Sequence, residues 1–227
     1  MTADGHGEDR YRGTAGEEYF AWQIEIGRLG AKLDVWKFEE FIRPDEVVAD
    51  FGCGGGFILD ALKCGRRVGV ELNPAARGHA ASLGIETHAS FDTVAEASVD
   101  LLISNHALEH AQAPHAELVR ALRALKPGSG RTVFVVPYDG WLNPEPFVPN
   151  EINQHLYAWT PLLLGNLFQS AGFEVEKVEV LWSAWTPDAY KWWGWNKTLY
   201  RIAQFFICLK YRAPQLRIFA KRPASKP

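Results

Sequence analysis

The fold is decided by the stretch Val47-Val48-Ala49-Asp50-Phe51-Gly52-Cys53-Gly54-Gly55-Gly56-Phe57. Its first five residues are a mostly apolar run typical of a buried strand, and the glycines after it predict a tight turn that leads into a helix. Glycine lets a ligand approach the backbone closely, and the start of a helix offers free N–H groups. Phe57 stands where the Gly-x-Gly-x-x-Gly motif of dinucleotide-binding folds needs its third glycine, which disfavours NAD. The stretch therefore predicts a site for another ligand, the alternative being a turn that binds nothing.

Short apolar runs and helical segments alternate on both sides of this stretch. Further strands are predicted at residues 67–71, 85–88, 100–104, 132–136, 173–182 and 215–221, and helices at 57–63, 74–83, 115–125 and 161–171. This alternation predicts a mostly parallel sheet with helices on both faces. We expect one domain over residues 1–227, with a flexible leader (1–15), N-terminal helices (16–43), a core (44–182), an insertion (183–213) and a last strand (214–222).

Composition and charge exclude several classes of protein. The chain has 227 residues, of which 47% are hydrophobic and 22% charged, as in folded globular proteins rather than disordered ones. Its three cysteines, Cys53, Cys64 and Cys208, form no paired spacing, which favours a reducing, cytoplasmic location. Residues 191–227 carry nine Lys or Arg and no acid, whereas the first 190 residues carry a net charge of −12. We therefore expect no nucleic-acid partner, while the basic tail remains available for an anionic partner.

A second acidic residue accompanies the glycine turn. Glu71 ends the second predicted strand, 21 residues after Asp50. A carboxylate at the carboxyl end of this strand is placed to accept hydrogen bonds from both hydroxyls of a ribose, whereas the alternative is a solvated surface residue. Asp50 and Glu71 together favour a nucleoside ligand.

At this point the sequence resembles the class I S-adenosylmethionine-dependent methyltransferases, in which an Asp-x-Gly-x-Gly-x-Gly turn follows strand one and an acid follows strand two. The resemblance runs from Val47 to about Val180 and includes the segments Val99–His110, which ends in Leu-Glu-His, Leu125–Gly128, His155–Pro161 and Ala171–Phe173. It implies a seven-stranded sheet with an antiparallel last strand and a helical, Trp-rich insertion before that strand.

The resemblance also implies S-adenosylmethionine as cofactor and assigns residues to it. Asp50 and the backbone of Gly52–Gly56 would hold the methionine part, Glu71 the ribose, and Asn105 would lie beside the sulfonium. The full set of implied cofactor residues is Asp50, Gly52, Cys53, Gly54, Gly56, Glu71, Leu72, His88, Ala89 and Asn105. Many relatives carry an acid after strand three, where this chain has His88-Ala89-Ser90-Phe91, so the residue that meets the adenine stays open.

Histidines are the candidates for the catalytic group. A hydroxyl acceptor must lose a proton near the transition state, and a positioned histidine accelerates that loss by roughly 10²–10⁴-fold. His110 and His155 follow strand ends at the predicted active edge, and His106 is a weaker third candidate. The alternatives are that His110 caps the loop and the next helix and that His155 packs against Trp159. No cluster of His, Cys and Asp has a metal-binding spacing, so no metal is expected.

Acceptor binding is predicted for a loop and for the Trp-rich insertion. The candidate residues are Tyr138, Asp139, Tyr157, Trp192 and Trp193. Aromatic rings stack on sugars and Lys or Arg pair with phosphates, which favours O-methylation of a small-molecule or glycan-type hydroxyl. The alternatives are N- or C-methylation of another metabolite and a non-catalytic module that only binds the cofactor. The aromatic and basic residues of 183–213 also fit peripheral contact with a membrane surface. The sequence predicts no particular oligomeric state.

Overall fold

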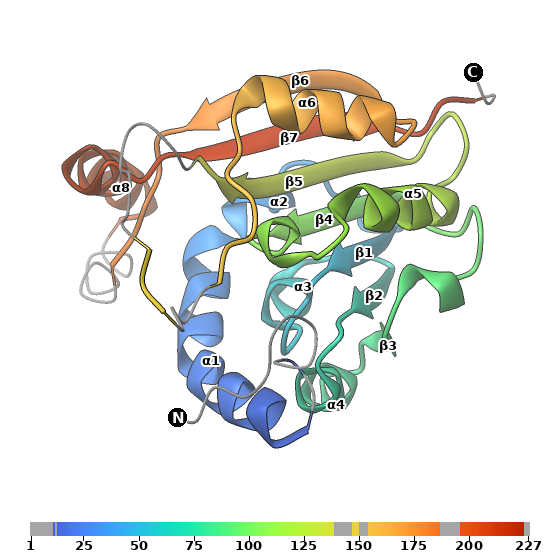
Figure 1. Cartoon of the computed structure of the whole chain (residues 1–227), viewed down its shortest axis with the longest axis horizontal. Coiled ribbons are helices and arrows are strands. Elements are labelled where there is room, and N and C mark those ends of the chain that lie inside the picture. The colour runs from blue at the N-terminus through green and yellow to red at the C-terminus, as the bar shows by residue number, and fades with distance from the viewer. Residues whose placement is uncertain (1–10, 12, 139–146, 150–153, 187–195, 225–227) are drawn as a thin grey trace.

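A computed structural model describes residues 11, 13–138, 147–149, 154–186 and 196–224. Its seven strands form one sheet in the order β3-β2-β1-β4-β5-β7-β6. The strands are β1 (Val47–Phe51), β2 (Arg66–Val70), β3 (Glu86–His88), β4 (Leu101–Asn105), β5 (Arg131–Pro137), β6 (Glu174–Leu181) and β7 (Gln215–Lys221). The first five pair in parallel, and β7 runs antiparallel between β5 and β6 (Figure 1). The predicted fold, including its antiparallel last strand, is confirmed.

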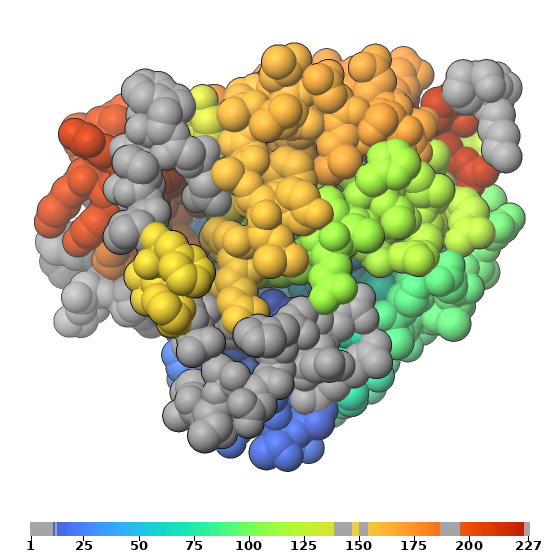
Figure 2. All heavy atoms as spheres, in the orientation of Figure 1, coloured from blue at the N-terminus to red at the C-terminus, as the bar shows by residue number. Residues whose placement is uncertain are grey.

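Alternating side chains of the strands fill two apolar cores, one on each face of the sheet. On one face Leu102, Phe134 and Val136 pack with α5 (Pro114–Ala124) and α6 (Pro161–Ser170), which lie in front of the sheet in Figure 1 and in the upper part of the surface in Figure 2. On the other face Leu101 and Val133 pack with α2 (Trp36–Glu39), α3 (Phe57–Ala61) and α4 (Pro74–Ser82). The sheet is therefore doubly covered, as the alternation of strands and helices predicts.

Two further helices lie beyond the ends of the strands. α1 (Gly13–Asp34) contacts α3 and α4, and α8 (Lys197–Tyr211) comes from the Trp-rich insertion (Figure 1). Leu33 of α1, Tyr200 of α8 and Trp185 form a small apolar cluster of their own. The described helices include none long and apolar enough to span a membrane. α1 and α8 thus form a layer beside the carboxyl ends of the parallel strands, where the sites of open α/β sheets lie.

Candidate active site

A cavity of about 1630 Å³ lies at the carboxyl ends of the parallel strands. Its lining comes from the glycine turn after β1, the residues after β2, β3 and β4, helix α1, and the segments around residues 154–158 and 184–185. Pockets for small ligands usually measure roughly 300–1,000 Å³. The cavity therefore has room for a nucleoside-sized ligand and a second molecule beside it.

The glycine turn has the backbone conformation that its sequence predicts. Gly52 and Gly54 have φ angles of +70° and +52°, in the left-handed region that favours glycine. A Cβ on Gly52 would lie 2.3 Å from the Cβ of Ala107, so this glycine lets the loop after β4 approach. A Cβ on Gly54 would meet no atom within 4 Å. The side of Gly54 that a side chain would occupy is thus open, and Gly54 lines the cavity.

Two carboxylates lie next to this turn. The Oε2 of Glu71 accepts a hydrogen bond from Gly54 N–H (2.9 Å), and its Oε1 accepts one from Asn73 N–H (2.8 Å). Burial raises the pKa of Asp50 well above its usual range, and the neighbouring Glu71 carboxylate raises it further. Burial also raises the pKa of Glu71, although the two N–H donors oppose the rise. Glu71 braces the turn while both carboxylates face the cavity, an arrangement suited to a ligand with hydroxyls or positive charge.

Helix α1 supplies a wall of the cavity that the sequence did not indicate. Tyr19, Phe20, Trp22 and Gln23 line it, and Trp22 stays 38% exposed although its spacing predicts an apolar, inward face. Asn73 ties the helix to the site, because its side-chain amide donates to the Gly16 carbonyl (2.8 Å). The helical periodicity of residues 16–42 predicts the helix but not the surface it covers. α1 forms this wall of the cavity because it docks on α3 and α4.

Another part of the cavity wall carries the histidines. The rings of His110 and His155 meet edge to face with centroids 5.0 Å apart. Both border the cavity, as do His106 and the fully buried Glu109, whose Oε1 lies 3.4 Å from His106 Nδ1. Burial lowers the pKa of His110, with the Glu109 carboxylate opposing that effect. The structure brings together residues 45 positions apart in the chain, which no local motif joins.

A buried lysine lies behind this side of the cavity. The ammonium group of Lys37 donates to Gln215 Oε1 (2.6 Å) and pairs with Asp34 (3.0 Å), and Asn105 Oδ1 lies 3.4 Å away. Burial lowers the pKa of Lys37, while Asp34 opposes the shift. Gln215 Oε1 also lies 3.1 Å from His106 Nε2. The sequence gives no signal that Lys37 is buried next to the cavity, and Lys37 is not among the predicted site residues.

The predicted site residues fall into three groups. The residues that border the cavity are Asp50, Gly52, Cys53, Gly54, Glu71, Leu72, Ala89, Asn105, His110, Tyr138, His155 and Tyr157. Gly56 and His88 lie outside the lining: Gly56 starts α3 and faces Ile85 and Ala80, and the His88 ring turns to Thr93 and Glu86. Asp139, Trp192 and Trp193 lie outside the described residues.

Among its described residues, the insertion lines the cavity only through its two ends. Ala184 and Trp185 at one end and Arg212 and Ala213 at the other border the cavity, whereas the described residues of α8 between them do not. The indole N–H of Trp185 donates to Asp34 Oδ2 (3.2 Å). Since α8 is held away from the cavity, the expectation that the insertion as a whole forms an acceptor wall is too broad for its described part.

Comparison with known proteins relates the chain to enzymes. The family model described as a methyltransferase domain matches residues 27–178. A search of curated proteins found no significant match. A Haloferax volcanii chain described as a methyltransferase, solved with the Trm112 activator, is 20% identical, with a TM-score of 0.60 over 91% of this chain and 98% of that one.

Two further solved structures have the same fold. Phosphoethanolamine N-methyltransferase 2 of Haemonchus contortus, solved with S-adenosyl-L-methionine, is 16% identical, with a TM-score of 0.61 over 98% of this chain and 61% of that one. A Thermotoga maritima protein described as an S-adenosylmethionine-dependent methyltransferase is also 16% identical, with a TM-score of 0.60 over 91% of this chain and 95% of that one.

Proposed function

Because the chain belongs to the methyltransferase domain family and is an S-adenosylmethionine-dependent methyltransferase, we propose that its acceptor is a hydroxyl group of a small-molecule or glycan-type substrate. The cofactor supplies a methyl group on a sulfonium, which an acceptor atom displaces in line. Such a displacement mainly needs the two reactants to be aligned and water to be excluded. The residues of this chain would do that work from the two sides of one cavity.

The cofactor side is the glycine turn with its two carboxylates. The open space at Gly54 fits a ligand lying against the backbone, and a buried Asp50 with a raised pKa fits a cationic partner that restores its ionised form. A role of Glu71 in binding the ribose is supported by the second lone pair that each of its oxygens keeps after accepting one backbone N–H. Leu72 and Ala89 border the same region and fit the apolar faces of the nucleoside.

The observation that carries the hydroxyl assignment is the pair His110 and His155 on the other side of the cavity. A hydroxyl is a weak nucleophile until it loses its proton, so a site for it needs a group that accepts or orients that proton. A neutral amine attacks without such a group. Tyr138 and Tyr157 border the same cavity, and aromatic rings of this kind stack on sugars and other rings.

N-methylation is the alternative within enzymes, and the Haemonchus neighbour is named as an N-methyltransferase. The two assignments differ in the acceptor that is turned over. We would measure release of S-adenosylhomocysteine with a panel of monosaccharide glycosides, phenols and primary or secondary amines. The proposal predicts release with hydroxyl compounds that lack an amine. Turnover confined to amines would refute it, and cofactor binding without any turnover would favour a binding module.

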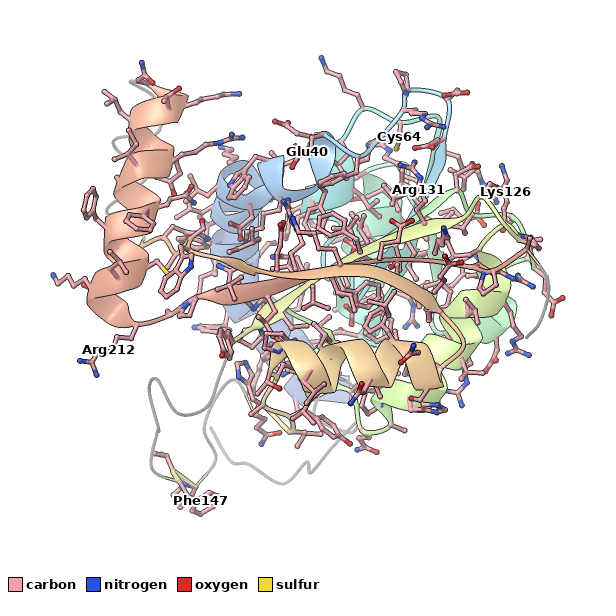
Figure 3. The ribbon with its side chains drawn as sticks, turned by 90° about the horizontal axis from the view of Figure 1, so that it is seen from above. Glu40, Cys64, Lys126, Arg131, Phe147 and Arg212 are labelled. Atoms are coloured by element: carbon pink, nitrogen blue, oxygen red, sulfur yellow. The ribbon has the colours of Figure 1, made fainter. Side chains whose placement is uncertain are left out.

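We also propose that α8 contacts an anionic membrane surface. Its outer face exposes Leu199, Ile202, Phe205, Phe206, Leu209 and Tyr211. Residues 197–212 contain four Lys or Arg and no acid. Arg212, which follows the helix, borders the cavity but directs its side chain away from the molecule (Figure 3). An amphipathic helix with an apolar face and basic flanks fits the interface of anionic lipids. Membrane contact at α8 would leave the cavity free, because the described residues of α8 do not line it.

A further inference from the structure

We propose that Glu109, His110 and His155 form a binding site for a divalent transition-metal ion such as Zn²⁺ on the acceptor side of the cavity. One potential ligand atom from each side chain lies within 4.8 Å of the other two. Two imidazoles and one carboxylate with open positions are a ligand set used by catalytic zinc sites. The three side chains also border the cavity, so the remaining coordination positions face a space that a substrate can enter.

The strongest support is the state of Glu109. Its side chain is completely buried, yet neither carboxylate oxygen has a hydrogen-bond partner among the described residues. The Nδ1 of His110 is likewise buried without a hydrogen-bond partner among them. A buried carboxylate is costly unless it is paired or bound to a metal. A cation between Glu109 and His110 would satisfy both groups at once.

A chain of hydrogen bonds behind Glu109 decides whether His106 can donate a hydrogen bond to its carboxylate. Gln215 donates its amide N–H to the Ser183 carbonyl (2.6 Å), which leaves Oε1 facing Lys37 and His106. Since Oε1 can only accept, His106 must present its Nε2–H to it. With a single proton on Nε2, the His106 ring presents the lone pair of Nδ1 to Glu109. That atom cannot donate a hydrogen bond to the carboxylate. A cation bound beside Glu109 would compensate its carboxylate without any proton from His106.

The ligand spacing fits after small side-chain rotations. Bonds of about 2.0–2.2 Å around a tetrahedral ion place its ligands roughly 3.3 Å apart. His155 is exposed, so its ring can turn toward His110 without displacing the core. The backbone next to it is already fixed, because Leu156 N–H donates to the Glu109 carbonyl (2.9 Å). The loop that carries His155 is thus anchored to the turn that carries the other two ligands.

This inference deepens the proposed function, on which its catalytic meaning rests. A metal ion at this position would bind an acceptor oxygen and lower the pKa of a coordinated hydroxyl. It would also favour acceptors that offer an oxygen ligand, such as a diol or an α-hydroxy carbonyl group. Zinc binds oxygen ligands together with imidazole nitrogen. The metal site itself can be tested without any acceptor.

The test uses the full chain purified without a histidine tag and freed of metal by dialysis against a chelator. Titration with Zn²⁺ by calorimetry, and with Co²⁺ by its visible absorption, should show one site per chain. His155→Ala should weaken metal binding at least about tenfold, because it removes one ligand from an exposed position where folding is not at risk. Glu109→Gln should do the same where that variant folds. His115→Ala is the matched control, since His115 is exposed on α5 away from the cavity.

Binding of S-adenosylhomocysteine is measured on the same variants. Retained cofactor affinity with lost metal binding in His155→Ala supports the inference. No stoichiometric metal binding by the unsubstituted chain, or binding that His155→Ala leaves unchanged, overturns it. Failure of S-adenosylhomocysteine to bind would instead count against the cofactor assignment, so the two proposals can fail separately.

Discussion

At the scale of single residues, Gly54 offers the sharpest test of the cofactor site. Gly54→Ala should weaken S-adenosylmethionine binding at least about tenfold, because its methyl group would occupy the open space beside the turn. Gly84→Ala is the control: Gly84 also has a positive φ (+74°) and an open Cβ position, but it does not line the cavity. Calorimetry on both variants separates backbone strain from lost cofactor space. If Gly54→Ala binds the cofactor as tightly as Gly84→Ala and the unsubstituted chain do, the cofactor does not lie against Gly54.

The raised pKa of Asp50 predicts that replacing this residue has opposite effects on the free energy of unfolding and on cofactor binding. Its raised pKa means that the folded protein keeps a proton which the unfolded chain has lost. The free energy of unfolding therefore falls as the pH rises from the ordinary carboxyl value toward the raised one. Asp50→Asn should remove this fall, stabilise the ligand-free protein at pH 7 by about 1 kcal/mol or more, and weaken cofactor binding by roughly tenfold to hundredfold.

Urea denaturation at several pH values and cofactor calorimetry measure both effects of Asp50→Asn. Asp60→Asn is the matched control at an exposed aspartate of α3 that pairs with Arg67; it should change the free energy of unfolding by less than about 1 kcal/mol and leave cofactor binding unchanged. A less stable Asp50→Asn protein at pH 7, with an unchanged pH profile, would mean that Asp50 is ionised and paired in the ligand-free state.

At the scale of elements, Lys37 joins the N-terminal helices to the start of β7. It pairs with Asp34 at the end of α1 and donates to Gln215. Lys37→Met should lower the free energy of unfolding by about 3–5 kcal/mol, because it leaves the buried Asp34 carboxylate without its cation. The double variant Asp34→Asn/Lys37→Met should recover part of that loss in urea denaturation.

Lys63→Met, which removes an exposed lysine after α3, is the control and should cost less than about 0.5 kcal/mol. A similarly small cost for Lys37→Met would mean that Asp34 does not depend on Lys37 for compensation. The indole N–H of Trp185 would then be its sufficient partner.

The elements show which parts could be predicted from the sequence. β1 and the glycine turn follow from one local stretch, since an apolar run and positive-φ glycines are sufficient to specify them. The wall formed by α1 could not be predicted, because periodicity gives a helix an apolar face without naming what it meets. The grouping of His106, Glu109 and His155 depends on the pairing of β4 and β5 and on the loop beyond, which are non-local.

Two of the predicted cofactor residues, Gly56 and His88, lie outside the cavity lining for local reasons. Gly56 belongs to the glycine motif but precedes the start of α3, and the His88 ring, in the segment where the chain departs from the family, is engaged by Thr93 and Glu86. A sequence motif predicts which residues lie near a ligand, but it does not specify the direction in which each residue faces.

At the scale of the whole molecule, α8 predicts a salt-dependent association with membranes. Flotation with vesicles containing phosphatidylserine should recover the protein at low salt and release it as the basic charges are screened. Phe206→Glu should abolish flotation and leave cofactor binding unchanged, because Phe206 is 62% exposed on the outer face. Leu162→Glu is the matched control, at an exposed position of α6. Flotation that does not respond to Phe206→Glu would exclude this face.

The position of β7 sets the order in which the protein is completed during its synthesis. The ribosome makes β6 first, but the neighbour of β6 in the sheet is β7, so β6 cannot pair until residues 215–221 have emerged. Gln215 at the start of β7 is also the partner of Lys37, 178 residues earlier. A nascent chain therefore carries an exposed β5 edge, which is a template for aggregation, and a site without its Gln215 contacts. Products of interrupted translation that stop before residue 215 would be inactive and would be substrates for chaperones or proteases.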